Sequence, residues 1–349
     1  MTDCESAVAT RVVRWQQSHG RSHLPWQQTR DPYRVWLSEI MLQQTQVGTV
    51  LDYYARFLER FPDVSSLAKA SPDEVLALWS GLGYYSRARN LHRCAQQIVA
   101  EHGGAFPGSA QTLATLPGIG RSTAGAIAAF CFGERAPILD ANVRRVLTRL
   151  LGFGDDLAIA ANERKLWELA STLLPQRDLH HSMPRYTQGM MDLGAMVCLP
   201  RKPQCGQCPL HSCCQAGQQG DPENYPVKTR KVLRKSESWW LLIQRDSTER
   251  VWLHRRPSRG IWAGLHCLPV FPERQALIDR IPHDMVPGIL EMPPVLHVLT
   301  HRDLHLHPVH VGATRHPLLS EEDGGWFERA QWQQLGLPAP VRKLLEDVA

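Results

Sequence analysis

The spacing of hydrophobic residues changes part-way along the chain, from a helical period to the alternation of strands. In the first part, helices are predicted at residues 6–19, 71–79, 110–116, 122–130, 160–175 and 185–197, with another beginning at Asp31-Pro32. After residue 238 the pattern predicts a pair of strands at 239–244 and 251–254, a strand at 305–311 and a closing helix at about 338–348. The pattern predicts a helical domain followed by a domain that contains strands.

One acidic residue interrupts an apolar helical segment. Glu39 lies within residues 35–42, which are otherwise nearly all apolar. Burial disfavours the charged form of a carboxyl and raises its pKa, as a general acid working near neutral pH requires. The alternative is a glutamate on the helix surface that points into water.

Polar and aromatic residues next to glycine turns indicate contacts with nucleic acid. Residues 43–46 are an uncharged polar run suited to hydrogen bonds with base edges, although a polar helix face has the same composition. The turn at 81–89 carries Tyr84 together with arginines. Aromatic rings can open a base step and arginines neutralise phosphates. The alternative is a tyrosine that packs in the core.

A second glycine turn, at residues 116–123, separates two predicted helices. Gly118 and Gly120 let the backbone turn tightly and direct N–H groups outward at a helix start, where an anion is favoured. From these glycines alone, an ordinary helical corner is the simpler interpretation. Twenty residues later, Asp140 stands where a helix N-cap is expected. A carboxylate held there by N–H groups could also stabilise a developing positive charge.

Four cysteines lie within seventeen residues, at Cys198, Cys205, Cys208 and Cys214. This spacing indicates a metal site, either a tetrahedral zinc or an iron–sulfur cluster. Cys213 is a fifth candidate that composition does not rank. Nine cysteines in all, four of them clustered, are typical of a reducing compartment. The sequence shows no basic and apolar leader and no apolar run long enough for a membrane span, so export is not expected.

The charge is distributed unevenly along the chain. Residues 1–235 carry 27 Lys and Arg against 20 Asp and Glu, whereas residues 236–349 carry 12 against 14. The basic first part suits a polyanion, although the excess is modest for its length.

Several motifs together resemble the adenine-DNA glycosylases of the MutY type, a branch of the endonuclease III, helix-hairpin-helix superfamily. The matching stretches are 24–26, 36–47, 81–90, 116–124, 138–145, 190–198 and the four-cysteine loop. The resemblance implies a multi-domain protein with an all-α helix-hairpin-helix glycosylase domain at 1–216, which includes an iron–sulfur loop at 198–214. A linker at 217–237 and an α/β Nudix-like domain at 238–349 would follow.

The resemblance also implies roles for individual residues. Glu39 is the expected general acid, Asp140 the stabilising carboxylate and Asn142 a residue that orients it. The base pocket is expected to contain Trp26, Gln27 and Gln188. The residues expected to contact DNA are Leu42, Gln44, Tyr84, Gly118, Gly120, Arg121, Ser122, Thr300 and His301. The expected ligands of a [4Fe–4S] cluster are Cys198, Cys205, Cys208 and Cys214, with Cys213 excluded.

The implied activity is removal of adenine mispaired with 8-oxoguanine or guanine in double-stranded DNA. The lysine of the related lyases stands two residues after the second glycine of the hairpin, where this chain has Ser122, so no strand cleavage is expected. The second domain lacks the Nudix catalytic signature and should bind without hydrolysing nucleotides. Its Leu299-Thr300-His301 turn replaces a Phe-Ser-His turn of the family, so the aromatic ring is missing.

Two alternatives remain open at this stage. One is a thymine-mismatch glycosylase of the same branch, which generally lacks the second domain. The other is a non-catalytic DNA sensor that carries a cluster, which would not need both Glu39 and Asp140. A monomer in the bacterial cytoplasm is expected, and the sequence names no repair-protein partner.

Overall fold

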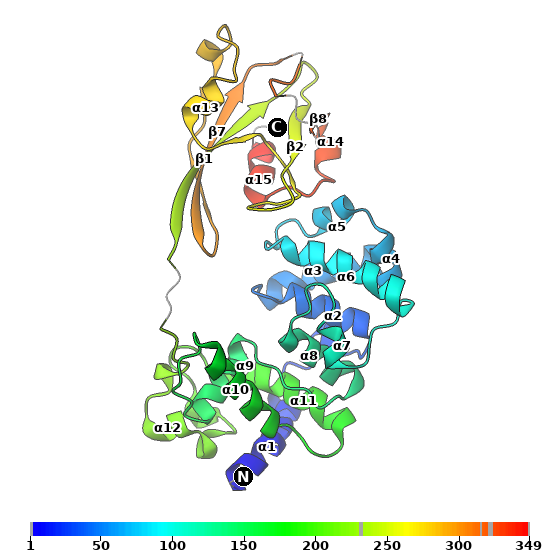
Figure 1. Cartoon of the computed structure of the whole chain (residues 1–349), viewed down its shortest axis with the longest axis vertical. Helices are drawn as coiled ribbons and strands as arrows, with labels where there is room; N and C mark the ends of the chain where they lie inside the picture. The colour runs from blue at the N-terminus through cyan, green and yellow to red at the C-terminus, as the bar shows by residue number, and fades with distance from the viewer. Residues whose placement is uncertain (1–2, 230–232, 315, 320–323, 348–349) are drawn as a thin grey trace. The chain divides into compact units, whose positions relative to one another are not determined.

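The computed structural model describes all residues except 1–2, 230–232, 315, 320–323 and 348–349 (Figure 1). The chain divides into two compact units. The first contains residues 1–50, 63–65 and 93–231, and the second contains residues 51–62, 66–92 and 232–349. The second unit therefore combines two short segments of the helical region with the C-terminal portion. The boundaries that the sequence suggested, at 216 and 238, remain a prediction.

The first unit is helical. Its α-helices are α1 (Asp3–His19), α2 (Pro32–Met41), α7 (Ala110–Leu113), α8 (Arg121–Phe132), α9 (Ala141–Leu150), α10 (Ala160–Thr172), α11 (Leu179–Asp192) and α12 (Gln215–Gln219). Short helical turns are η1 (Pro25–Gln27), η2 (Leu193–Val197), η3 (Cys205–Gln207), η4 (His211–Cys213) and η5 (Pro222–Asn224). Three helices contain residues of both units: α3 (Val47–Arg60), α4 (Val64–Lys69) and α6 (Ser86–His102).

Local sequence signals explain where these helices begin and end. Asp31 caps α2 by accepting a hydrogen bond from the Tyr33 backbone N–H at 2.9 Å, and Pro32 occupies the first helical position. Helix α8 ends at Gly133, which takes a left-handed conformation with φ 67°. The predicted helix at 185–197 begins earlier, at Leu179, and closes in the turn η2.

A hydrophobic cluster packs α1, α9 and α11 of the first unit together. Val12 of α1, Leu147 of α9 and Met190 of α11 are at most 1% exposed and belong to one cluster. Each such side chain contributes roughly 1.5–3 kcal/mol by leaving water. Helix α8 packs closely against the segment before α9 at Gly125. A Cβ added to Gly125 would lie only 2.4 Å from the carbonyl oxygen of Pro137. This close approach fixes the segment that leads to Asp140.

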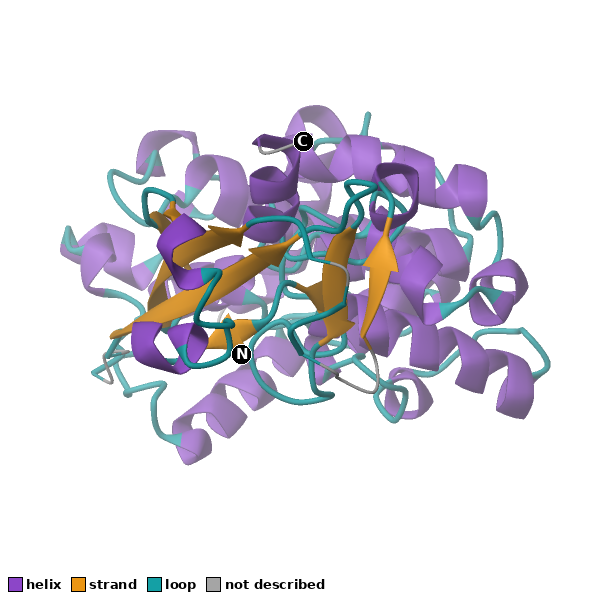
Figure 2. Cartoon of the chain, turned by 90° about the horizontal axis from the view of Figure 1, so that it is seen from above, coloured by secondary structure: helices purple, strands orange, loops and turns teal. Residues whose placement is uncertain are grey.

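The second unit contains α5 (Pro72–Leu78) and all described strands, which are drawn in orange in Figure 2. The strands are β1 (Lys235–Gln244), β2 (Val251–Arg255), β3 (His266–Cys267), β4 (Val270–Phe271), β5 (Leu290–Glu291), β6 (Val295–Val298), β7 (Arg302–Val311) and β8 (Gly324–Phe327). Its C-terminal helices are α13 (Arg274–Ile278), α14 (Arg329–Trp332) and α15 (Ala339–Asp347), with a turn η6 (Val286–Gly288).

The strands form two sheets, and one predicted pairing is wrong. The first sheet has the order β4-β1-β7-β5, with β6 also paired to β7, and the second has the order β3-β2-β8. The expected pair β1 and β2 therefore lies in different sheets, and a bridge between Arg245 and Val251 connects them. Strand β1 instead pairs in parallel with β7 along its whole length. A parallel partner requires a long connection, which local alternation does not reveal.

Among the described residues, no helix combines the length and the apolar character needed to cross a membrane.

Candidate active site

The predicted acid, Glu39, lies on α2 and faces a pocket in the first unit. The pocket is also lined by Trp26, Gln27 and Gln188, the three residues expected to hold a base, so the structure brings these four together. Val35 and Ser38 of the same helix also line the pocket. Burial, and to a smaller extent the charge of Asp140, raises the pKa of Glu39 to about 8. Glu39 therefore holds a proton at neutral pH.

The remaining walls of the pocket come from α1, the segment between α1 and α2, α8 and α11. They are formed by Gln16, Gln17, Ser22, Thr29, Arg30, Phe130, His181, Pro184 and Arg185. The amide of Gln27 is notable because both its nitrogen and its oxygen are buried, with no hydrogen-bond partner among the described residues. An unpaired buried amide is costly, so this side chain is a candidate functional residue.

Asp140 caps α9, as the sequence predicts. Its Oδ1 accepts hydrogen bonds from the backbone N–H groups of Asn142 at 2.7 Å and Val143 at 2.9 Å. Burial raises the pKa of Asp140 above its ordinary value, although these two hydrogen bonds act in the opposite direction. Desolvation has the larger effect of the two.

The two carboxyls lie in one site. The negative charge of Asp140 is one of the causes that raise the pKa of Glu39. Two backbone N–H groups, Arg145 and Arg144 favour the charged form of Asp140 and oppose the effect of its burial. The geometry thus provides a proton donor facing the pocket and a nearby carboxylate.

Asn142 connects this site to the cysteine loop through Arg145. The Nη2 of Arg145 donates to Asn142 Oδ1 at 2.8 Å and to the Gly194 carbonyl at 2.6 Å, and its Nε donates to the Cys198 carbonyl at 2.7 Å. The sequence analysis missed Arg145. Its position three residues after Asn142 places both on one face of α9, which is a signal that could have identified it.

The hairpin between α7 and α8 has the predicted form. Gly118 has φ 77°, which favours glycine, and Gly120 is the N-cap of α8 without a side-chain cap. The first N–H groups of α8 therefore lack a side-chain acceptor at the cap. Ser122 Oγ accepts a hydrogen bond from the Leu139 N–H at 3.0 Å. The guanidinium of Arg121 lies over the Trp167 ring, 4.1 Å from its centre.

The other residues expected to contact DNA lie outside the pocket. Leu42 is the C-cap of α2, and Gln44 has a left-handed backbone with φ 57°. Tyr84, in the second unit, is also left-handed, with φ 48°. Non-glycine residues in this conformation are strained and occur often at functional sites.

Within the second unit, Tyr84 lies beside the turn between β6 and β7. Its hydroxyl is 2.5 Å from Thr300 Oγ1, and both residues line one cavity together with His301. The same cavity contains Trp262 and His297, which the sequence analysis did not select. The structure thus brings Tyr84, Thr300 and His301 together in a surface of mixed aromatic and polar character.

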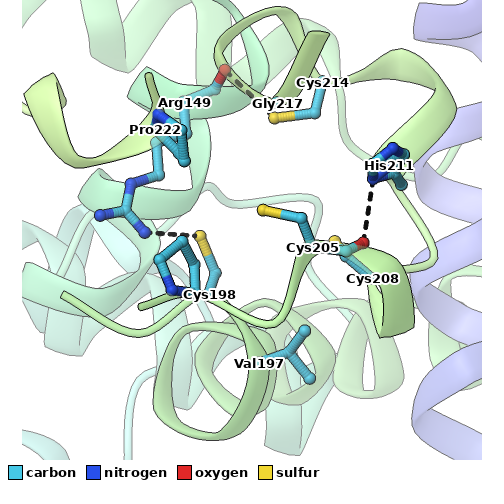
Figure 3. Close-up of a pocket in the computed structure, with 10 residues that line it drawn as sticks. Arg149, Val197, Cys198, Cys205, Cys208, His211, Cys214, Gly217 and Pro222 are labelled. Atoms are coloured by element: carbon cyan, nitrogen blue, oxygen red, sulfur yellow. Dashed lines mark hydrogen bonds between the residues drawn. The ribbon is translucent and has the colours of Figure 1, made fainter. Parts of the chain in front are cut away.

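Cys198, Cys205, Cys208 and Cys214 line one small chamber, and Cys213 is not part of its lining. Figure 3 shows the four side chains around this space. The buried Arg149 closes one side: its Nη1 donates to Cys198 Sγ at 3.3 Å, and its carbonyl oxygen lies 3.4 Å from Cys214 Sγ. In the part of the chain that the structure describes, no three potential ligands converge on a single ion. Four sulfur donors spread around a chamber fit a polynuclear group.

Family models match two separate parts of the chain. A family model described as "HhH-GPD superfamily base excision DNA repair protein" matches residues 37–172, and one described as "NUDIX domain" matches residues 239–347. A curated protein of Buchnera aphidicola subsp. Acyrthosiphon pisum, named "Adenine DNA glycosylase", is 37% identical over 344 residues and covers 96% of each chain.

Solved structures resemble the helical part. A thermostable thymine-DNA glycosylase has a TM-score of 0.56 and 29% identity, covering 62% of this chain and 97% of its own. A non-covalent endonuclease III–DNA complex has a TM-score of 0.51 at 23% identity, covering 63% of this chain and 99% of its own, which shows a shared fold.

Proposed function

Because this chain belongs to the adenine DNA glycosylase family, we propose that it removes adenine mispaired with 8-oxoguanine or guanine from duplex DNA, by hydrolysing the N-glycosidic bond. The observation that carries the proposal is that Glu39, which holds a proton at neutral pH, lines one pocket with Trp26, Gln27 and Gln188. A base in duplex DNA is out of reach of such a pocket, so the nucleotide must first be flipped out of the stack.

The pocket residues suit an adenine. A glutamine amide carries a donor and an acceptor side by side, which matches the donor and acceptor edge of adenine. The Trp26 ring, only 6% exposed, forms an apolar wall against which a purine can pack. Gln188 supplies a second amide on the opposite helix, α11.

The chemistry begins with the proton of Glu39. Adenine leaves readily only when its ring is protonated, and Glu39 holds a proton at neutral pH that it can donate to N7. The bond between N9 and C1′ then breaks, and its electron pair goes to the base. The sugar becomes a cation resembling an oxocarbenium ion, which the nearby carboxylate of Asp140 stabilises. Water adds at C1′ and its proton returns to Glu39, while Asn142 orients Asp140 or the water.

We expect no strand cleavage by the enzyme itself. A lyase of this superfamily uses a lysine amine to form a Schiff base with the sugar, and Ser122 stands at that position. The Ser122 hydroxyl accepts a hydrogen bond from the segment before Asp140, so it has a structural role there.

Two surfaces would hold the DNA. The hairpin around Gly118 and Gly120, with Arg121 and Ser122, presents N–H groups and positive charge to a phosphate. In the second unit, Tyr84, Thr300 and His301 would form the second surface and contact the base opposite the adenine, with Tyr84 as the wedge. Leu42 and Gln44 of the first unit would also contact that base. Support for the second surface comes from the contact between Tyr84 and Thr300.

The four-cysteine chamber would hold a [4Fe–4S] cluster. When bound, the cluster ties the segments at Cys198, Cys205, Cys208 and Cys214 into one rigid loop. Arg201 and Lys202 on this loop are exposed and can contact a phosphate. Arg145 donates hydrogen bonds to the Cys198 carbonyl on this loop and to Asn142 Oδ1, and so connects the loop to Asn142. We expect a monomer that acts on double-stranded DNA in the bacterial cytoplasm, as the bacterial relative supports.

The test is a single-turnover reaction on a labelled duplex with adenine opposite 8-oxoguanine, read with and without alkali. Breakage at the adenine that requires alkali is expected. A matched duplex with adenine opposite thymine should remain intact, and so should one with thymine opposite guanine. Removal of the thymine would instead indicate the thymine branch, and tight binding without breakage would indicate a DNA sensor.

A further inference from the structure

One buried carboxylate, Asp192, holds two walls of the base pocket at once. It lies in the last turn of α11 and its side chain is fully buried. Its Oδ1 accepts hydrogen bonds from Gln188 Nε2 at 2.9 Å and from Arg21 Nε at 2.8 Å. Its Oδ2 accepts from the backbone N–H of Arg21 at 3.0 Å. The carboxylate therefore joins a pocket residue on α11 to the loop that leads to Trp26 and Gln27.

These contacts determine the orientation of the Gln188 amide. An ionised carboxylate only accepts hydrogen bonds, so the NH₂ group of Gln188 must face Asp192. The Oε1 of Gln188 then points the other way, and Gln188 lines the pocket. At Gln188 the pocket wall therefore presents a hydrogen-bond acceptor. Without Asp192 the amide could rotate by half a turn and present its NH₂ group instead.

Arg21 pairs with Asp192 and holds it in place. A buried carboxylate is tolerated only when it is paired and hydrogen-bonded. The guanidinium supplies the positive charge of the pair. It is partly hydrated, since 27% of the Arg21 side chain is exposed. Because Arg21 also donates its backbone N–H, the same contact anchors the start of the loop at 21–28.

We propose that Asp192, held by Arg21, is a positioning residue that fixes the Gln188 oxygen toward the pocket and thereby selects a 6-aminopurine over a 6-oxopurine. This inference rests on the proposed adenine site. An acceptor oxygen attracts the 6-amino group of adenine, which donates, and repels the 6-oxo group of hypoxanthine, which accepts. Both bases carry the N7 to which Glu39 would deliver its proton, so the comparison isolates recognition at position 6.

The experiment compares single-turnover rates on duplexes with adenine or hypoxanthine opposite 8-oxoguanine. In Asp192→Asn the new amide can donate to the Gln188 oxygen and turn the Gln188 amide around. The ratio of the adenine rate to the hypoxanthine rate is expected to fall by about tenfold or more, the size of one base-edge contact. The control is Asp246→Asn in the second unit. Asp246 is also buried, with 8% of its side chain exposed, and the substitution removes its ion pair with Arg250. This variant should leave the ratio unchanged.

A double-variant series separates positioning from loss of stability. Once Gln188→Ala has removed the amide, adding Asp192→Asn should not change the rate ratio further. If Asp192→Asn does not fold, Arg21→Gln provides the test, since Arg21 is partly exposed. Arg21→Gln is expected to lower the rate ratio about threefold. The effect is smaller because Asp192 keeps one of its two side-chain partners.

The outcomes distinguish this inference from the proposed function. If the wild type removes neither base, the proposed function itself fails. If the wild type removes adenine but the folded Asp192 or Arg21 variant keeps the wild-type rate ratio, the positioning role is wrong and selectivity resides elsewhere, with Gln27 as the first candidate.

Discussion

Asp140 lies close enough to Glu39 for its charge to affect the protonation of Glu39. Burial has the larger effect on Glu39, and the negative charge of Asp140 adds to it, so that the pKa of Glu39 rises to about 8. Glu39 is thus a proton donor at neutral pH. It faces the pocket from an apolar helix, whereas Asp140 receives two backbone N–H groups at a helix start.

The first prediction concerns the pH dependence of base removal. Because Glu39 must be protonated to act, the single-turnover rate with saturating enzyme should be nearly constant from pH 6 to 7. It should fall about tenfold per pH unit well above pH 8. The measurement is the rate constant between pH 5.5 and 9.5 at constant ionic strength. A rate that increases through pH 8 would assign Glu39 the role of a base.

The second prediction concerns stability. In the unfolded chain Glu39 ionises near its ordinary pKa of 4.5, whereas in the folded protein it stays neutral up to about pH 8. The folded state therefore loses stability as the pH rises from about 4.5 to 8. Glu39→Gln should be more stable than the wild type at pH 8, by roughly 1–3 kcal/mol after allowance for partial exposure.

Chemical denaturation of both proteins at pH 5 and pH 8 measures this difference. It should be larger at pH 8. An equal difference at both pH values would show that Glu39 has an ordinary pKa in the folded protein.

The third prediction concerns Asp140. Asn at this position can still accept from the N–H groups of Asn142 and Val143, so Asp140→Asn should fold. It lacks the negative charge, and its single-turnover rate should fall by about 100-fold or more. The pH at which the remaining activity declines should also move below that of the wild type, because one cause of the raised Glu39 pKa is gone. An unchanged midpoint would show that the two carboxyls do not interact.

The fourth prediction concerns the cysteine chamber. Cys205→Ser removes one of four thiols that line it and should reduce the iron and acid-labile sulfide bound per chain. Cys131→Ser is the matched control, since this free thiol does not line the chamber, and it should retain the wild-type content. Zinc in place of iron in the purified wild type, at one atom per chain, would contradict the cluster.

Local signals in the sequence predicted much of the site. The Asp140 cap, the hairpin glycines and the chamber of four cysteines each depend on residues that are near each other in the chain, so spacing and turn chemistry reveal them. The apolar surroundings of Glu39 along α2 likewise indicated its raised pKa. These features follow from helix geometry and capping, which act over a few residues.

Long-range partners were beyond such signals. The contact of Asp192 with Arg21 joins residues 171 positions apart, and Arg145 reaches a carbonyl 53 positions away. Neither partner can be inferred from spacing, because the fold brings them together. The pairing of β1 with β7 has the same origin: alternation marks each strand but does not identify its neighbour.

The measurement that tests the central claim most directly is single-turnover removal of adenine opposite 8-oxoguanine by Glu39→Gln, together with its affinity for the same duplex. Glutamine keeps the size of the side chain but has no acidic proton. We predict that Glu39→Gln keeps its DNA affinity and loses alkali-dependent breakage. The control is Glu163→Gln, which alters a carboxylate paired with Arg144 outside the pocket lining and should keep its activity. Breakage by Glu39→Gln at the wild-type rate would contradict the assignment of Glu39 as the general acid.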